Sequence, residues 1–126
     1  MYLMYWVDLC LKVREEDIMP ILTLRAIKEH EAVSISRGLI DELEELLECP
    51  RDYFTLELRN STFIKDGDIC NGYPMVDVSW FARGQEIQDK VAKIITKYIK
   101  ELGYETVEIT FHVLEEKLYY ENGVHF

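Results

Sequence analysis

Apolar residues recur along the chain with the periods of strands and helices, and these periods predict its elements. Met19-Pro20 precedes an apolar run from Ile21 to about Ile27, which is typical of a short buried strand. From Ala32 to Leu47 the apolar residues show the three-and-four spacing of a helix with one buried face. Pro50 ends this helix, because the residue before a proline is pushed out of helical geometry.

Strict alternation from Phe54 to Arg59 predicts a second strand, which we expect to run on toward Phe63 and Ile64 before turn residues at 65–68 and 71–72. The order of elements then repeats. Pro74 opens a strand that alternates through Trp80, and Gly84 leads into a helix that Gly103 is placed to cap. A fourth strand alternates over 107–113, and the tail, 118–126, reads as a small hairpin about an Asn-Gly turn.

The pattern is therefore two strand–helix–strand halves, each opened by a proline. Parallel strands joined by a right-handed helical crossover form one unit, and two units can share one sheet. We expect an α/β fold (α+β by some conventions) with a four-stranded mixed sheet and both helices on one face. The other face would carry polar residues and is either the wet side of an open sheet or the interior of an oligomer; these residues are Glu57, Arg59, Asp77, Glu108, Thr110 and His112.

Composition adds that this is one acidic domain. The chain has 126 residues and a formal net charge of -10, which disfavours nucleic acid and anionic membranes as partners. Its three cysteines show no CxxC pattern and no secretory signal precedes them, so we expect free thiols in the cytoplasm. The three histidines lack metal-ligand spacing, and we expect no cofactor or metal.

Residues 1–18 are interpreted as a translated leader from a start codon assigned too early, which leaves a domain at 19–126. Arg14-Glu15-Glu16-Asp17 can be back-translated into a purine-rich ribosome-binding sequence, at a suitable distance before an ATG at Met19. The alternatives are a real N-terminal element packed on the core and an amphipathic anchor over residues 1–11.

The candidate catalytic group is the nitrogen of Pro20, which directly follows Met19. Removal of the methionine would leave a proline with a free secondary amine, which can act as a general base, whereas the same nitrogen in a peptide bond has no basic lone pair. If the two halves run antiparallel, Trp80, Phe81 and Arg83 border this proline. Arg83 and the N-terminus of the second helix could then bind a substrate carboxylate.

The proline at the head of strand one, with the segments 73–74, 80–89 and 119–126, resembles an uncharacterised bacterial family in the tautomerase superfamily, which includes macrophage migration inhibitory factor. The resemblance covers about residues 20–126 and implies a homotrimer whose sheets surround a central channel. It also implies that Pro20 moves a proton between carbon and oxygen in a keto–enol pair. This chain departs from migration inhibitory factors in having Cys49, Glu108 and Thr110 in place of a lysine, a tyrosine and an asparagine, which puts the known substrates in doubt.

Simpler roles stand beside each of these assignments. Arg83 could pair with Glu86 or Asp89 on the helix surface, and Trp80 could be core. Arg59 with Glu57 is interpreted as a structural ion network, and residues 119–120 as subunit-boundary contacts. Three functions follow: a proline-dependent tautomerase of small carbonyl acids, an inactive small-molecule-binding or structural trimer with the same fold, and a membrane-associated protein held by residues 1–11.

Overall fold

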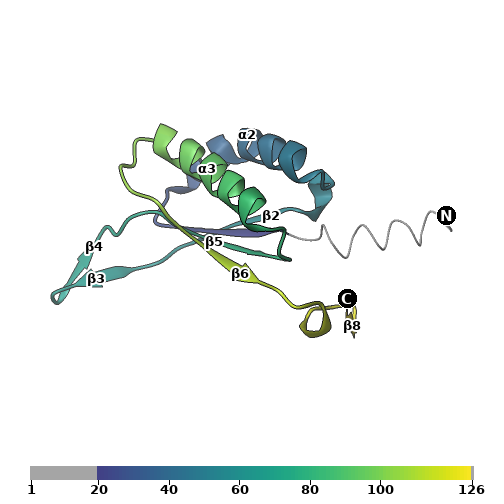
Figure 1. Cartoon of the computed structure of the whole chain (residues 1–126). Helices are drawn as coiled ribbons and strands as arrows, with labels where there is room; N and C mark the ends of the chain where they lie inside the picture. The colour runs from purple at the N-terminus through teal and green to yellow at the C-terminus, as the bar shows by residue number, and fades with distance from the viewer. Residues whose placement is uncertain (1–19, 126) are drawn as a thin grey trace, which may run out of the picture.

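The computed structural model describes residues 20–125. Two helices cover one face of a four-stranded sheet whose order is β2-β1-β5-β6 (Figure 1). The strands of this sheet are β1 (Ile21–Arg25), β2 (Thr55–Arg59), β5 (Met75–Trp80) and β6 (Glu108–Val113), and the helices are α2 (Glu29–Leu47) and α3 (Gln85–Glu101). β1 is parallel to β2 and β5 is parallel to β6, whereas the inner pair β1 and β5 is antiparallel. The expected pair of strand–helix–strand units in one mixed sheet is confirmed.

The two halves begin in the same way. Pro20 and Pro74 are both buried, and each directly precedes an inner strand. The Pro20 carbonyl accepts a hydrogen bond from Thr55 N at 3.0 Å, and the Pro74 carbonyl accepts one from Glu108 N at 3.1 Å. A proline loses no ladder hydrogen bond at the first position of a strand, so each one starts its unit without a cost to the sheet.

The core lies between the sheet and the helices. Alternation places Leu22 and Leu24 of β1 beside Val76 and Val78 of β5, all 1% exposed or less. The helices contribute a complementary apolar stripe, which consists of Ala32, Ile35, Leu39, Ile40, Leu43 and Leu47 from α2 and Val91, Ile95 and Ile99 from α3. Burial of these two apolar surfaces against each other is the main term that stabilises the fold.

Capping hydrogen bonds stand at both ends of α2, and glycines flank α3. The Glu31 carboxylate accepts a hydrogen bond from Lys28 N at 3.1 Å at the start of α2. Glu48 closes α2 in left-handed geometry, with its N–H donating to the Glu44 carbonyl at 2.9 Å, so the helix ends before it reaches Pro50. Gly84 and Gly103 flank α3 with φ values of 91° and 106°, which glycine adopts without strain.

Two strand boundaries differ from the sequence prediction. β1 ends at Arg25 instead of about Ile27, because Ala26 takes a φ of 65° that a strand does not allow. β2 ends at Arg59 and does not continue to Ile64. Residues Phe63–Lys65 instead form β3, which pairs with β4 (Asp68–Cys70) in a separate hairpin about the predicted Asp-Gly turn.

Two small hairpins extend away from the sheet-and-helix body (Figure 1). The β3–β4 hairpin exposes Ile64 and Ile69, which are 72% and 79% accessible and directly paired across its strands. The second hairpin, β7 (Tyr120–Glu121) and β8 (Val124–His125), follows the 3₁₀ helix η2 (Glu116–Leu118) and has the predicted Asn-Gly turn. A further 3₁₀ helix, η1 (Arg51–Tyr53), precedes β2. No helix within residues 20–125 is long and apolar enough to cross a membrane.

Candidate functional site

Pro20 lies at the head of an inner strand, between β2 and β5. It is less than 2% exposed, and its carbonyl oxygen is held by Thr55. Ile21 pairs with Ser79 in the antiparallel register of β1 and β5, so the end of β5 runs beside the start of β1, as expected. Continued by one residue, the same register brings Pro20 opposite Trp80. The residues that precede Pro20 lie outside the described part of the chain.

Trp80 and Phe81 are both buried, but in different surroundings. Trp80 is 1% exposed and belongs to the core, where its ring lies 5.0 Å from that of Phe111. Phe81 is 6% exposed and meets Tyr119 of the C-terminal segment edge to face, with ring centroids 5.6 Å apart. Burial, and then the negative charge of Glu121, raise the pKa of the Tyr119 phenol. The two aromatic residues therefore give the Pro20 end of the sheet an apolar interior.

Arg83 makes a contact that the sequence did not predict. Its Nη1 donates a hydrogen bond to the Leu47 carbonyl at 3.2 Å, which joins the loop before α3 to the last turn of α2. A cation at this position also suits the negative end of the α2 dipole. Asp89, one of the partners considered for Arg83, accepts instead from Gln85 Nε2 at 2.8 Å. An anion-binding role for Arg83 stays a prediction.

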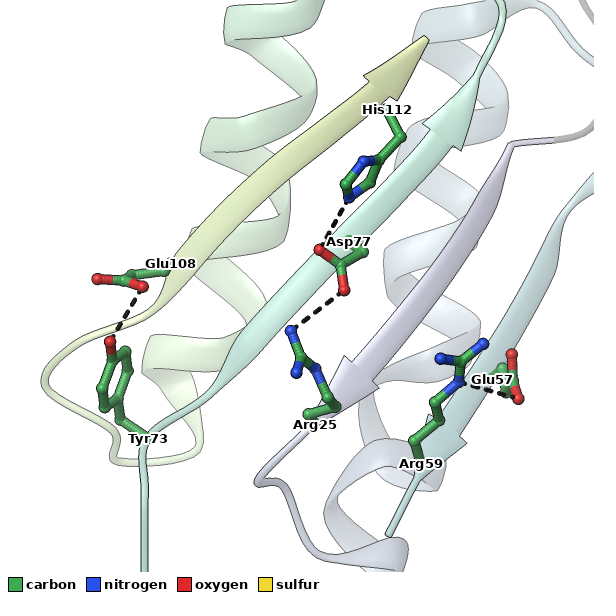
Figure 2. A network of polar contacts seen from close by, with 7 residues as sticks. All are labelled: Arg25, Glu57, Arg59, Tyr73, Asp77, Glu108 and His112. Carbon is green, nitrogen blue, oxygen red and sulfur yellow. Dashed lines mark hydrogen bonds and ion pairs between the residues drawn. The ribbon is translucent and has the colours of Figure 1, made fainter. Parts of the chain in front are cut away.

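Polar side chains cover the sheet face that points away from the helices, as predicted (Figure 2). Asp77 stands at its centre, on β5. One carboxylate oxygen, Oδ2, lies 3.3 Å from Arg25 Nη2, and the other, Oδ1, lies 3.2 Å from His112 Nε2. Three neighbouring strands are therefore connected through a single carboxylate. Thr23, the neighbour of Asp77 on β1, is 7% exposed.

Two further polar pairs flank this centre (Figure 2). On β2, Arg59 Nε lies 3.5 Å from Glu57 Oε2, an exposed pair that agrees with the structural interpretation of these residues. At the start of β6, the Tyr73 hydroxyl donates to Glu108 Oε1 at 3.1 Å, and this bond raises the pKa of the Tyr73 phenol.

Of the residues that replace the migration inhibitory factor positions, Glu108 lies at the end of the sheet opposite Pro20 within one chain. Glu108 pairs with Met75 at the start of β5, whereas Pro20 is next to the end of β5. Cys49 is buried, and its Sγ lies 3.8 Å from the Pro50 carbonyl. A site that combines Glu108 with a proline amine would therefore need Pro20 from another copy of the chain.

Comparison with known proteins identifies the family. A model described as "Domain of unknown function (DUF1904)" matches residues 19–125. The chain belongs to this DUF1904 family. It is 39% identical to a DUF1904 domain from Sebaldella termitidis, with a TM-score of 0.81 over 86% of this chain and 100% of that one. A protein of unknown function from Vibrio cholerae is 37% identical, with a TM-score of 0.79 over 88% and 90% of the two chains.

The wider fold is that of the tautomerase superfamily. A macrophage migration inhibitory factor homologue from Prochlorococcus marinus is 21% identical and matches with a TM-score of 0.67 over 85% of this chain and 99% of its own. This similarity concerns the fold alone. The predicted uncharacterised family is therefore confirmed, and so is the predicted fold. The comparison with curated proteins gives no match.

Proposed function

We propose that this DUF1904 protein is a proline-dependent tautomerase of small carbonyl acids. With a chain that begins at Pro20, the free amine takes a proton from the carbon next to a carbonyl, and the proton is returned to the carbonyl oxygen to give the enol. The reverse transfer restores the ketone. No electrons are exchanged, so the reaction needs no redox cofactor.

The observation that carries this proposal is the position of Pro20. It lies buried at the head of an inner strand, next to Trp80 at the end of β5, which Phe81 follows directly. An apolar environment disfavours the protonated amine, which keeps the base free near neutral pH. Arg83, close by in sequence, is the candidate for the substrate carboxylate.

The proposal requires that residues 1–18, and then Met19, are absent from the working protein, which we place in the cytoplasm. The family match supports this reading because it begins at residue 19, the methionine before Pro20. Mass spectrometry of protein made from its own gene tests it directly. We expect a mass that corresponds to a start at Pro20. A chain that retains residue 1 would contradict the proposed role of Pro20 as a base.

We also propose that the working form is a homotrimer. The sheet has a polar face without a covering layer in the described residues, and its outer strands β2 and β6 each lack a second partner there. The extended β3–β4 hairpin presents Ile64 and Ile69 to solvent in the single chain. Contacts with neighbouring copies would cover this apolar surface and the sheet edges.

A second candidate is an inactive binding or structural trimer. One observation favours it: Arg83 already donates to the Leu47 carbonyl, and Trp80 is fully part of the core. Both residues therefore contribute to the fold, and this contribution explains their presence without any reaction.

Phenylpyruvate enolisation, followed by ultraviolet absorbance, separates the two candidates. A chain released from a cleavable tag at Pro20 is compared with the full 126-residue chain and with Pro20→Ala. We expect activity only in the first, with a loss of roughly 100-fold or more in the variant, the usual contribution of a general base. Pro50→Ala, which changes an exposed proline outside the sheet, is the matched control. Inactivity of the correctly processed chain would favour the second candidate.

A further inference from the structure

A cavity of about 660 Å³ lies at the end of β1 opposite Pro20. Pro20 precedes the first residue of β1, and Ala26, which lines the cavity, follows the last. At about 3.3 Å per strand residue, the two sites are roughly 20 Å apart. A molecule in this cavity would therefore not touch the proposed base. The walls come from the start of α2, the base of the β3–β4 hairpin and the loop after α3.

Lys28 and Arg59 are the cationic residues among those that line the cavity, and both have donors that no described residue uses. Within the described residues the Lys28 ammonium forms no ion pair, and the only partner of the Arg59 guanidinium is Glu57, which it meets through Nε. The terminal nitrogens of Arg59 are therefore available to an anion. Positive charge is unexpected here because the whole chain carries -10.

The one acidic residue in the lining is already engaged. The Glu31 carboxylate accepts hydrogen bonds from the Tyr104 hydroxyl and from Lys28 N. The bond from Tyr104 is the largest cause of a lowered pKa at Glu31, so this carboxylate stays ionised and bound within the protein. Glu31 and Glu57, the partner of Arg59, match the two cations in number, but each carboxylate is already engaged within the protein.

The remaining walls combine amide donors with an apolar surface. The side-chain amides of Asn60 and Asn71 have no hydrogen-bond partner among residues 20–125. The Phe63 ring packs against the backbone of Gly72, where a Cβ would lie 2.5 Å from the ring, and Ile27 adds a buried aliphatic side chain. A ligand that fits these walls has an anionic head and an apolar body.

We propose that this cavity is a binding site for a small organic anion, a carboxylate or phosphate group attached to an apolar or aromatic body. Lys28 and Arg59 bind the charged group, the two asparagine amides donate to its oxygens, and Phe63 contacts the body. The site is separate from the proposed Pro20 reaction, and its existence does not depend on that reaction.

Titration of ¹⁵N-labelled protein tests the site with three probes: phenylacetate, phenyl phosphate and the neutral phenylacetamide. We expect the two anions to shift the backbone amides of Asn60, Asn71 and Gly103, and the neutral probe to bind at least tenfold more weakly. Comparable affinity for phenylacetamide would overturn the assignment to an anion. Absence of shifts at these amides up to millimolar concentration would overturn the site.

Charge removal identifies the binding groups. The double variant Lys28→Gln/Arg59→Gln should weaken phenylacetate binding about tenfold or more, since charge-assisted hydrogen bonds are lost. Arg37→Gln/Lys93→Gln changes the same residue types on exposed helix surfaces outside the cavity and is the matched control. Affinities within twofold of each other for the two double variants would overturn the proposal.

A filling variant distinguishes loss of charge from loss of fold. Ser61 lines the cavity and is exposed, so Ser61→Trp adds bulk without removing a cation or a core residue. This variant should keep its melting temperature and lose the amide shifts. Retained binding in a folded Ser61→Trp protein would place the probe elsewhere.

Discussion

At the scale of single residues, Gly72 shows how closely the β3–β4 hairpin packs at its base. Its φ is 56°, and a Cβ there would lie 2.5 Å from the Phe63 ring. Gly67, in the turn of the same hairpin, has a φ of 85° but has open space around it. A substitution at Gly67 would therefore introduce backbone strain alone, whereas one at Gly72 would also introduce a side-chain clash.

We expect Gly72→Ala to destabilise the protein more than Gly67→Ala. Both variants introduce the strain of a positive φ, about 1 kcal/mol, and only the first also displaces Phe63, at roughly 1–3 kcal/mol more. Urea unfolding and hydrogen exchange of the hairpin amides measure the difference. Equal losses of stability in the two variants would show that Phe63 can move aside at no cost in free energy.

Individual contacts differ in how well they could be predicted. The polar face was visible in the alternation of β2, β5 and β6, and the same alternation in β1 also places Thr23 and Arg25 there, although we did not predict either. The Tyr73–Glu108 bond joins residues 35 positions apart and depends on sheet pairing. No local pattern signals such a contact.

At the scale of elements, two tyrosines connect α3 and the loop after it to α2. The Tyr98 hydroxyl donates to the Glu42 carboxylate, which also lies 2.6 Å from Lys97 Nζ, and the Tyr104 hydroxyl donates to Glu31. The bond to Glu42 raises the pKa of Tyr98 to about 12. Burial and then the bond to Glu31 raise the pKa of Tyr104 to about 12.

These shifts predict a loss of stability at high pH. A phenol whose pKa is raised on folding contributes stability that is fully present below pH 10, its ordinary pKa, and is lost as the pH rises to about 12. We therefore expect the melting temperature to fall across this window, and to fall less in Tyr98→Phe/Tyr104→Phe. Absorbance of the phenolates at high pH provides a second readout. Identical pH profiles for the two proteins would contradict the assignment.

The elements with long periods were predictable and the short ones were not. The stripes of α2 and α3 and the alternation of β5 and β6 each extend over enough residues to define a face. β3 and β4 have three residues each, so alternation could not reveal them. Their Asp-Gly turn was recognised, but the second strand after it was not. Ala26 ends β1 through a positive φ, which could not be predicted because alanine rarely adopts this conformation.

At the scale of the whole molecule, the proposed trimer makes a prediction about the β3–β4 hairpin. Ile64→Asp/Ile69→Asp places two charges where we expect a neighbouring copy, and it should shift the mass in solution toward the monomer. Val33 is 68% exposed on α2, so Val33→Asp tests a helix surface outside the proposed contact and should leave the mass unchanged. Light scattering after gel filtration measures both. A monomeric mass for the wild-type chain would contradict the proposed trimer.

The fold and family were accessible from the sequence because the pattern of two similar halves is long and regular. The substrate was not, because the proposed base, the Pro20 nitrogen, is a backbone atom and has no side-chain group that identifies a ligand. The cavity around Lys28 and Arg59 was also invisible, since its walls come from three segments that only the folded chain brings together.

Pro20 and Pro74 have matching positions, so neither the side chain nor its burial distinguishes the two prolines; under the proposed function, only a chain start at Pro20 does. A circularly permuted protein that began at Pro74, with its original ends joined, would present a secondary amine beside Glu108 and convert Pro20 into an ordinary amide. Under the proposed mechanism, the base would then lie at the other end of the sheet without a single change of amino acid. In such a fold, the position of the start codon would decide which proline carries the free amine.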